Sequence, residues 1–373
     1  MKNKERIQKA FLALVRAGLW EKEVGLSVLG DIDLKDIYRL AQEQSVVGLI
    51  TAGIEQVKDV QFPKEDVLTI VGESLQLEQR NLAMNSFVED LIAKLKEADI
   101  LALLVKGQGI AQCYERPLWR ASGDVDILFS KGDYKKAATF LSPLASSVDE
   151  DVSSKKHIAM TMDPWIVEFH GTLRSGLWKS LDRSLDEIQN EVFSSGAVRP
   201  WMNGNTQVFM PRADEDVVFV FSHILQHFFK EGIGLRQICD WCRLLWKFRD
   251  NIDVKLLESR ILSMGVMTEW RTFSTLAVEY LGMPEEAIPL YYPSNRWKRN
   301  ADKVMTFILE VGNFGNNRDR SYITKSSYVT RKIISLWRHT SDGIRYFFIF
   351  PLDSVKVWLS MVITGIEFIA KGK

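Results

Sequence analysis

RASGDVDILF, residues 120–129, places two aspartates one residue apart in a run that is otherwise typical of a buried strand. Side chains alternate between the two faces of a strand, so Asp124 and Asp126 point the same way, with Cα atoms on the order of 6 to 7 Å apart. Val125 and Ile127 point the other way and can anchor the strand in a core. The stretch therefore predicts a strand with one apolar face and one acidic face.

Two carboxylates this close raise each other's pKa or require a counter-charge. A divalent cation can supply that charge, and Mg²⁺ takes carboxylate oxygens together with substrate phosphates. The alternative is a pair of solvated acids at the end of a strand. If the two aspartates bind a metal ion, their mutual repulsion destabilises the protein while the metal site is empty. Replacing Asp126 by Asn would then stabilise the metal-free protein or leave its stability unchanged.

Upstream, LLVKGQGIA reads as a strand that ends at Lys106 and continues through Gly107, Gln108 and Gly109 into a helix. Glycines let the backbone approach a phosphate, a helix N-terminus offers free N–H groups, and the lysine adds positive charge. A plain strand-to-helix turn explains the same residues. If Lys106 is a surface lysine that binds phosphate, its removal would weaken nucleotide binding and leave stability nearly unchanged.

Downstream, VEFHG places Glu168 inside a third strand, with His170 on the same side. A glutamate there can be a metal ligand or a general base for an attacking hydroxyl. His170 can touch a substrate or orient Glu168. Arg120 can pair with Asp124 or with a phosphate, or it can be an ordinary surface arginine.

The pattern along the chain predicts an α+β protein with a small mixed sheet between helical flanks. Residues 1–85 and 214–373 read as helices, and residues 86–213 as an α/β core. Within the core, strands are expected at ILALLVKG, VDILF, WIVEFHG and QVFMP, and a crossover helix at DYKKAATFLSPL.

Composition excludes several classes of protein. The 373 residues carry 48 Lys and Arg against 48 Asp and Glu, so no global charge attracts nucleic acid or an acidic membrane. Three cysteines cannot form a disulfide framework, and the apolar start FLALV is cut short by Arg16, so we expect a cytoplasmic protein. At the C-terminal end the longest uncharged run, Val357 to Ile366, is ten residues, well below the roughly 20 that span a bilayer.

These residues together resemble the polymerase-β-type nucleotidyltransferase superfamily, and in particular a poorly characterised bacterial branch called nucleotidyltransferase family protein. The resemblance covers roughly residues 85 to 245. The matching positions are Lys106, Gly107, Tyr114, Arg120, Asp124, Asp126, Glu168 and His170, followed by His223, His227, Arg236 and Asp240. The chain departs from the superfamily pattern in its first motif, where K-G-Q-G stands in place of glycine followed by glycine or serine.

The resemblance implies a nucleotidyltransferase core that moves a nucleoside monophosphate from a nucleoside triphosphate onto a hydroxyl. It implies that Asp124, Asp126 and Glu168 hold Mg²⁺, for which Mn²⁺ can substitute, and that they are the catalytic residues. Lys106, Gly107, Gln108, Arg120 and His170 are then the predicted nucleotide contacts. The acceptor is open: a small molecule, a protein or RNA.

Four other interpretations stay open. A protein of the same fold could bind nucleotide or a partner without turnover. His223 and His227 with Cys239 and Cys242 have spacings that could bind zinc, or they could simply pack. The segment from Arg296 to Arg345 carries 11 basic residues against 4 acids, interleaved with aromatics, which suits single-stranded nucleic acid or a solvated helix face. The C-terminal helices could also dock on a partner or a membrane surface, and the chain would then be an adaptor.

Overall fold

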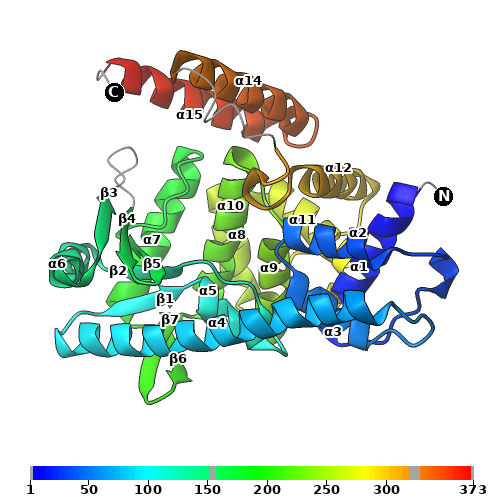
Figure 1. Cartoon of the computed structure of the whole chain (residues 1–373). Helices are drawn as coiled ribbons and strands as arrows, with labels where there is room; N and C mark the ends of the chain where they lie inside the picture. Colours follow the sequence, from blue (N-terminus) through cyan, green and yellow to red (C-terminus); the bar gives the residue numbers. More distant parts are fainter. Residues whose placement is uncertain (1–2, 151–156, 319–327, 371–373) are drawn as a thin grey trace.

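We describe a computed structural model of the chain, covering residues 3–150, 157–318 and 328–370. A single seven-stranded mixed sheet lies in the middle, with helical regions on either side of it in the sequence (Figure 1). The predicted α+β class is confirmed. The sheet is larger than the expected small sheet because it includes three strands that the sequence analysis did not predict.

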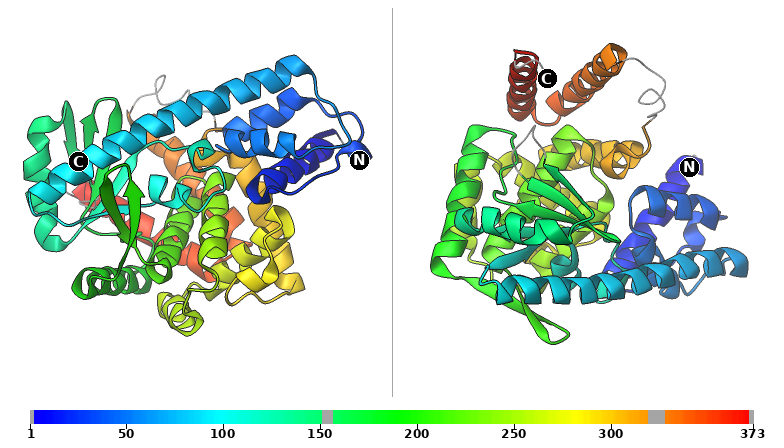
Figure 2. Two further views of the ribbon diagram at one scale, coloured as in Figure 1. Left: turned by 90° about the horizontal axis from the view of Figure 1, so that it is seen from below. Right: turned by 60° about the vertical axis from the view of Figure 1, so that its left-hand side comes forward.

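The N-terminal region consists of four helices, the last of which is much the longest. They are α1 (Asn3–Trp20), α2 (Leu34–Glu43), α3 (Val47–Glu55) and α4 (Lys64–Glu97). Helix α4 runs along one side of the molecule from the N-terminal helices to the sheet (Figure 2). The predicted boundary between residues 85 and 86 lies inside this helix, which joins the two regions rigidly.

The strands expected from the sequence are present, at β1 (Ala102–Val105), β2 (Val125–Phe129), β5 (Trp165–His170) and β7 (Thr206–Pro211). The sequence analysis missed β3 (Ser147–Glu150), β4 (His157–Met162) and β6 (Val198–Asn203). Strand β3 and strand β6 form the two edges of the sheet. Edge strands need no alternating apolar pattern, because only part of their surface is buried.

The order of the strands is β3-β4-β5-β2-β1-β7-β6. Strand β2 pairs in parallel with β5 and antiparallel with β1, and β1 pairs in parallel with β7. The register places Asp126 directly beside Glu168. The central strand therefore brings together side chains that are 42 positions apart in the numbering.

The two faces of the sheet are buried differently. Val125, Ile127 and Phe129 face a core that is shared with α4 and with α6 (Lys131–Leu141). On the other face, Val105 and Leu128 join the larger core built with the C-terminal helices. Asp126 shares that second face, so its carboxylate points toward the helices.

The remaining helices follow in order. They are α7 (Lys179–Ser195), which lies within the predicted core region, and then α8 (Ala213–Lys230), α9 (Leu235–Phe248), α10 (Val254–Met264), α11 (Met267–Leu281), α12 (Asn295–Val311), α14 (Tyr328–Phe347) and α15 (Pro351–Ala370). Short 3₁₀ turns occur at Ser27–Leu29, Pro117–Trp119, Ser142–Leu144, Glu285–Ala287 and Asn313–Gly315.

Among the described residues, aromatic side chains in and directly after the basic segment from Arg296 to Arg345 lie in different environments. Trp297 and Tyr346 are buried, whereas Trp337 is exposed. Residues 319–327 of this segment, with Tyr322, lie outside the described residues. Helix α15 is packed on one side, through Val357, and exposes Leu352 on the other. Within the described ranges, no helix has the length and apolar character needed to cross a membrane.

Candidate active site

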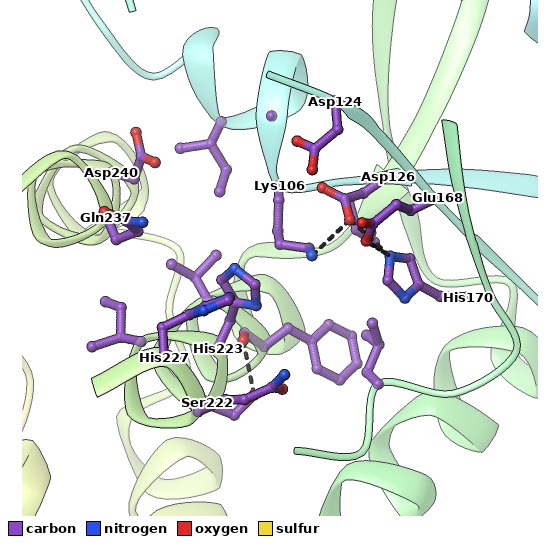
Figure 3. A pocket seen from close by; sticks show the side chains of 18 of the residues that line it. Lys106, Asp124, Asp126, Glu168, His170, Ser222, His223, His227, Gln237 and Asp240 are labelled. Atoms are coloured by element: carbon purple, nitrogen blue, oxygen red, sulfur yellow. Dashed lines mark hydrogen bonds and ion pairs between the residues drawn. The ribbon is translucent and has the colours of Figure 1, made fainter. Parts of the chain in front are cut away.

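A cavity of about 350 Å³ lies between the acidic face of the sheet and helices α8 and α9 (Figure 3). Its sheet side carries Asp124, Asp126, Glu168 and His170, with Lys106 at the end of β1. Its helix side carries Ser222, His223, His227, Arg236, Gln237 and Asp240. The structure thus brings the three predicted acids to one cavity.

Asp126 is the centre of the cluster and is only 4% exposed. Its Oδ1 atom lies 2.7 Å from Lys106 Nζ and 2.7 Å from His170 Nε2. Burial by itself would raise the pKa of Asp126, but the Lys106 ammonium and the His170 hydrogen bond outweigh burial and hold that pKa well below its usual value. Asp126 is therefore an ionised carboxylate with an internal partner.

This contact corrects two expectations. The nearest counter-charge of the paired aspartates is Lys106, so removing the Asp126 charge would break the closest ion pair of a buried ammonium as well as relieve repulsion. Lys106 is also no surface lysine, because its side chain is 17% exposed. We now expect both Asp126→Asn and Lys106→Ala to destabilise the protein.

The backbone at Lys106 is unusual. Its φ of +57° and ψ of −145° lie in a region that non-glycine residues rarely adopt. This conformation turns β1 abruptly into α5 (Gly107–Ala111). Strained residues persist only where the surrounding structure holds them, and they concentrate at functional sites.

Within the described part of the chain, no lysine or arginine forms an ion pair with Asp124 or Glu168 as close as that of Lys106 with Asp126. Repulsion from Asp126, together with burial, raises the pKa of Asp124. Burial and the neighbouring Asp126 carboxylate raise the pKa of Glu168 to about 7. The side chain of Glu168 is 28% exposed, and its Oε2 atom lies 3.5 Å from His170 Nε2. The cluster holds three carboxylates against one ammonium, and a bound cation would lower both raised pKa values.

Arg120 lies at the edge of the cavity and is held by other side chains. Its Nε and Nη2 atoms donate to the two carboxylate oxygens of Asp240, at 2.9 and 2.7 Å. Tyr114 donates to the same carboxylate at 2.8 Å. The guanidinium is buried, so Arg120 ties the loop before β2 to α9 and sets the position of Asp124.

Gln108 is 2% exposed and lies outside the cavity wall. Its amide donates to Asn81 of α4 at 3.3 Å, and its carbonyl oxygen accepts from Ser122 at 3.2 Å. Gly109 packs against β7, where an added Cβ would lie 2.7 Å from the sulfur of Met210. Of the predicted phosphate loop, Lys106 and Gly107 line the cavity.

The four zinc candidates divide between two environments. His223 and His227 face the cavity with ring centroids 4.2 Å apart, and His227 Nδ1 lies 3.0 Å from Glu231 Oε2. Cys239 and Cys242 are fully buried free cysteines in the apolar core. Burial raises the pKa of both thiols, which disfavours the thiolate that binds zinc. The packing interpretation accounts for the cysteines.

His157 is one of the cavity residues that the sequence analysis did not identify. His157 lies on β4 directly opposite His170 of β5, and it lines the cavity. A signal was available: HIAMTM and WIVEFH flank a short turn at Asp163 and Pro164, which is typical of a hairpin. Pairing that hairpin places the two histidines side by side.

The residues of the cluster fit a divalent cation. Asp124, Asp126 and Glu168 supply hard carboxylate oxygens, the ligands that Mg²⁺ takes in proteins. Excess negative charge on one face of a cavity is the charge distribution that a cation would neutralise. The fold and this site together define a class: α+β proteins with an acidic cavity at the centre of a mixed sheet.

Comparison with known families agrees with this class. Residues 30–282 match a family described as uncharacterised nucleotidyltransferase, and the chain belongs to that family. The matched range includes every strand of the sheet and helices α8 and α9, so it includes both walls of the cavity. The resemblance noted from the sequence is thereby confirmed. None of the curated proteins and none of the solved structures gives a significant match.

Proposed function

We propose that this protein is a nucleotidyltransferase that moves a nucleoside monophosphate from a nucleoside triphosphate onto a hydroxyl of an acceptor. The observation that carries the proposal is the cluster of Asp124, Asp126 and Glu168, which faces a cavity with more negative charge than Lys106 neutralises. The family to which the chain belongs supports the same class of reaction.

The two aspartates and Glu168 would hold Mg²⁺, or Mn²⁺ in its place, and the ion would supply Lewis-acid stabilisation of the negative charge on the triphosphate. Asp126 is already ionised through its contact with Lys106 and is ready to bind a cation. Asp124 becomes a better ligand as the cation lowers its raised pKa.

Lys106 has a second role in this proposal. Its ammonium lies at the cavity wall, 2.7 Å from Asp126 Oδ1. Once another cation neutralises Asp126, the ammonium is free to contact a phosphate oxygen of the nucleotide. The lysine is thus the counter-charge of the empty site and the phosphate contact of the filled one.

Glu168 is the candidate general base. Its side chain is 28% exposed, whereas that of Asp126 is 5% exposed, and it lies beside His170. Burial and Asp126 raise the pKa of Glu168 to about 7 in the free protein. A bound cation would lower this pKa and leave the ionised carboxylate that a general base needs. Glu168 would accept the proton of the acceptor hydroxyl as the new bond to phosphorus forms and pyrophosphate leaves.

The test measures pyrophosphate release and nucleotide binding separately. Each labelled nucleoside triphosphate is incubated with Mg²⁺ and a lysate as the pool of acceptors, and the labelled product is isolated. Wild-type protein should release pyrophosphate and label an acceptor. The Glu168→Gln variant should still bind Mg²⁺-nucleotide in a calorimetric titration but lose turnover.

A second candidate is a nucleotide-binding protein without turnover, which the close ion pair between Lys106 and Asp126 favours because it occupies a metal-ligand oxygen. Tight binding of nucleotide in wild-type protein, with no pyrophosphate from any acceptor pool, would establish this candidate instead. Absence of nucleotide binding would refute both.

A further inference from the structure

A second group of potential metal ligands lies beside the three acids. His157, Glu168 and His170 each offer one ligand atom, and these atoms all lie within 4.8 Å of one another. Among the described residues, no other group of three or more His, Cys, Asp or Glu side chains meets this criterion. The three residues come from one hairpin, since His157 lies on β4 and the other two on β5.

The hairpin register explains why these side chains converge. His157 and His170 are direct partners across the antiparallel pair, with ring centroids 5.7 Å apart. Glu168 is two residues before His170 and therefore shares its face of the strand. The residue opposite Glu168 is Ala159, whose small side chain leaves space next to the carboxylate.

The site is held in place and opens to the cavity. His170 Nε2 lies 2.7 Å from Asp126 Oδ1, and this contact orients the imidazole beside the acids. The side chain of His170 is 10% exposed. All three residues line the cavity, so a bound ion would keep open positions on that side.

The ligand types select the metal. Two imidazoles and one carboxylate suit divalent transition metals such as Mn²⁺, Co²⁺ and Zn²⁺. Mg²⁺ prefers oxygen ligands alone and gives up its water reluctantly. Asp124 and Asp126 offer oxygens, whereas this group offers mostly nitrogen. The two groups therefore favour different ions, although they share Glu168.

We propose that His157, Glu168 and His170 form a binding site for a divalent transition metal, separate in ligand type from the carboxylate site and joined to it through Glu168. The site goes beyond the proposed nucleotide transfer and does not depend on it, because three side chains of one hairpin define it. A metal bound there would reach the same cavity as the nucleotide.

The test uses the full chain, freed of metal with a chelator, and Co²⁺ as the probe. Titration should give one equivalent of tightly bound Co²⁺ with a visible absorption spectrum of mixed nitrogen and oxygen ligation. Excess Mg²⁺ should not displace this equivalent, and Zn²⁺ should. Displacement of Co²⁺ by millimolar Mg²⁺ would overturn the proposal, because an oxygen-only site would then hold the ion.

Two matched variants locate the ion. His157→Gln should weaken Co²⁺ binding by at least about tenfold. His227→Gln makes the same change in a histidine of the opposite cavity wall and should leave Co²⁺ binding unaltered. The reverse pattern, with Co²⁺ lost from the His227 variant and kept by the His157 variant, would overturn the proposal in favour of the His223 and His227 pair.

A measurement on wild-type protein covers the case in which His157→Gln fails to fold. In the Co²⁺ form, each of the two coordinated histidines should give a paramagnetically shifted imidazole proton resonance. Shifted resonances from fewer than two histidines would overturn the proposal.

The assay of pyrophosphate release is independent of this result. Failure of nucleotide transfer with Co²⁺ bound as expected would refute only the proposed function, and the converse would refute only the metal site.

Discussion

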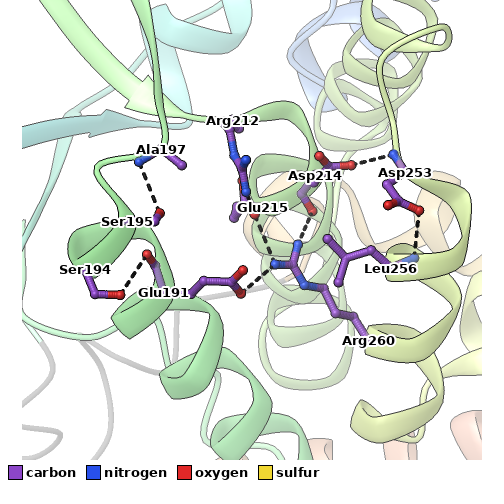
Figure 4. Close-up of polar contacts among 10 residues, drawn as sticks. All are labelled: Glu191, Ser194, Ser195, Ala197, Arg212, Asp214, Glu215, Asp253, Leu256 and Arg260. Atoms are coloured by element: carbon purple, nitrogen blue, oxygen red, sulfur yellow. Dashed lines mark hydrogen bonds and ion pairs between the residues drawn. The ribbon is translucent and has the colours of Figure 1, made fainter.

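The cavity cluster around Asp126 and the cluster around Arg260 each contain buried charged residues, and they differ in their balance of charge (Figures 3 and 4). Arg260 Nη2 lies 2.9 Å from Glu191 Oε2 and 3.0 Å from Glu215 Oε1. Arg212 adds a second guanidinium, with Nη2 3.0 Å from Glu215 Oε1. Two guanidinium groups therefore meet two carboxylates.

The cavity cluster sets three carboxylates against the Lys106 ammonium. The Arg236 guanidinium also lowers the pKa of Asp124, and His170 contacts Asp126. Moving unpaired charge out of water costs several kcal/mol per ion, so an arrangement that serves only stability is expected to balance, as the Arg260 cluster does. Repulsion from Asp126 and burial raise the pKa of Asp124, and burial together with Asp126 raises the pKa of Glu168. The difference separates a cluster whose charges are paired from one whose charge excess fits the proposed cation.

The largest effect is expected for Asp124→Asn. Loss of one carboxylate from the metal site should reduce nucleotide transfer by at least about a thousandfold, since a catalytic ion supplies several kcal/mol of transition-state stabilisation. The metal-free protein should keep its stability or gain slightly, because Asp126 repels Asp124. Pyrophosphate release and thermal melting measure the two effects. Asp250→Asn, at an exposed aspartate, is the control, and a marked drop in melting temperature for Asp124→Asn would contradict the comparison.

Arg260→Met should give the opposite result. Glu215 is 1% exposed and would lose one of its two cationic partners, so the free energy of unfolding should fall by about 3 kcal/mol. Nucleotide binding by the folded fraction should be unaltered. Urea denaturation measures the loss, with Arg249→Met at a partly exposed arginine as the control. A loss no greater than that of the control would mean that the Arg260 cluster contributes little to stability.

Lys106→Met should destabilise the protein by about 2 kcal/mol, since Asp126 would keep only His170 as a partner. The double variant Lys106→Met with Asp126→Asn should recover at least half of this loss, because it removes both buried charges. A double-mutant cycle in urea isolates the interaction. If the losses of the two single variants add in the double variant, the ion pair between Lys106 and Asp126 contributes little to the free energy of unfolding.

The last prediction concerns the thermal stability of Glu168→Gln, and this effect depends on pH. Because the pKa of Glu168 is raised to about 7 in the folded protein, its ionisation costs the folded state more than the unfolded state. Stability should therefore fall as the pH rises from the ordinary range of a glutamate pKa to above 7. Glu168→Gln should melt at a higher temperature than wild type at pH 8, by the equivalent of about 1 kcal/mol, and at the same temperature at pH 4. Equal melting temperatures at both pH values would show that Glu168 titrates normally.

Much of the fold followed from local patterns. Apolar runs such as VDILF and WIVEFHG indicated central strands because such strands are buried on both sides, and the long helical periodicities indicated the flanks. The edges of the sheet did not follow, because β3 and β6 obtain their pairing from neighbouring strands and their own residues have no clear preference. The continuity of α4 across residue 85 did not follow either, because Asn85 and Ser86 are residue types that often begin a helix.

The sequence by itself determined that Asp124 and Asp126 share one face of a strand, because alternation is a property of the extended backbone. It also indicated Glu168 as their partner, by resemblance to a known family. Only the tertiary structure decided where the counter-charge comes from. Lys106 reaches Asp126 through the turn after β1, Arg120 pairs with Asp240 of α9, and His157 meets His170 across a hairpin. These contacts depend on strand register and helix packing, which residue spacing along the chain does not specify.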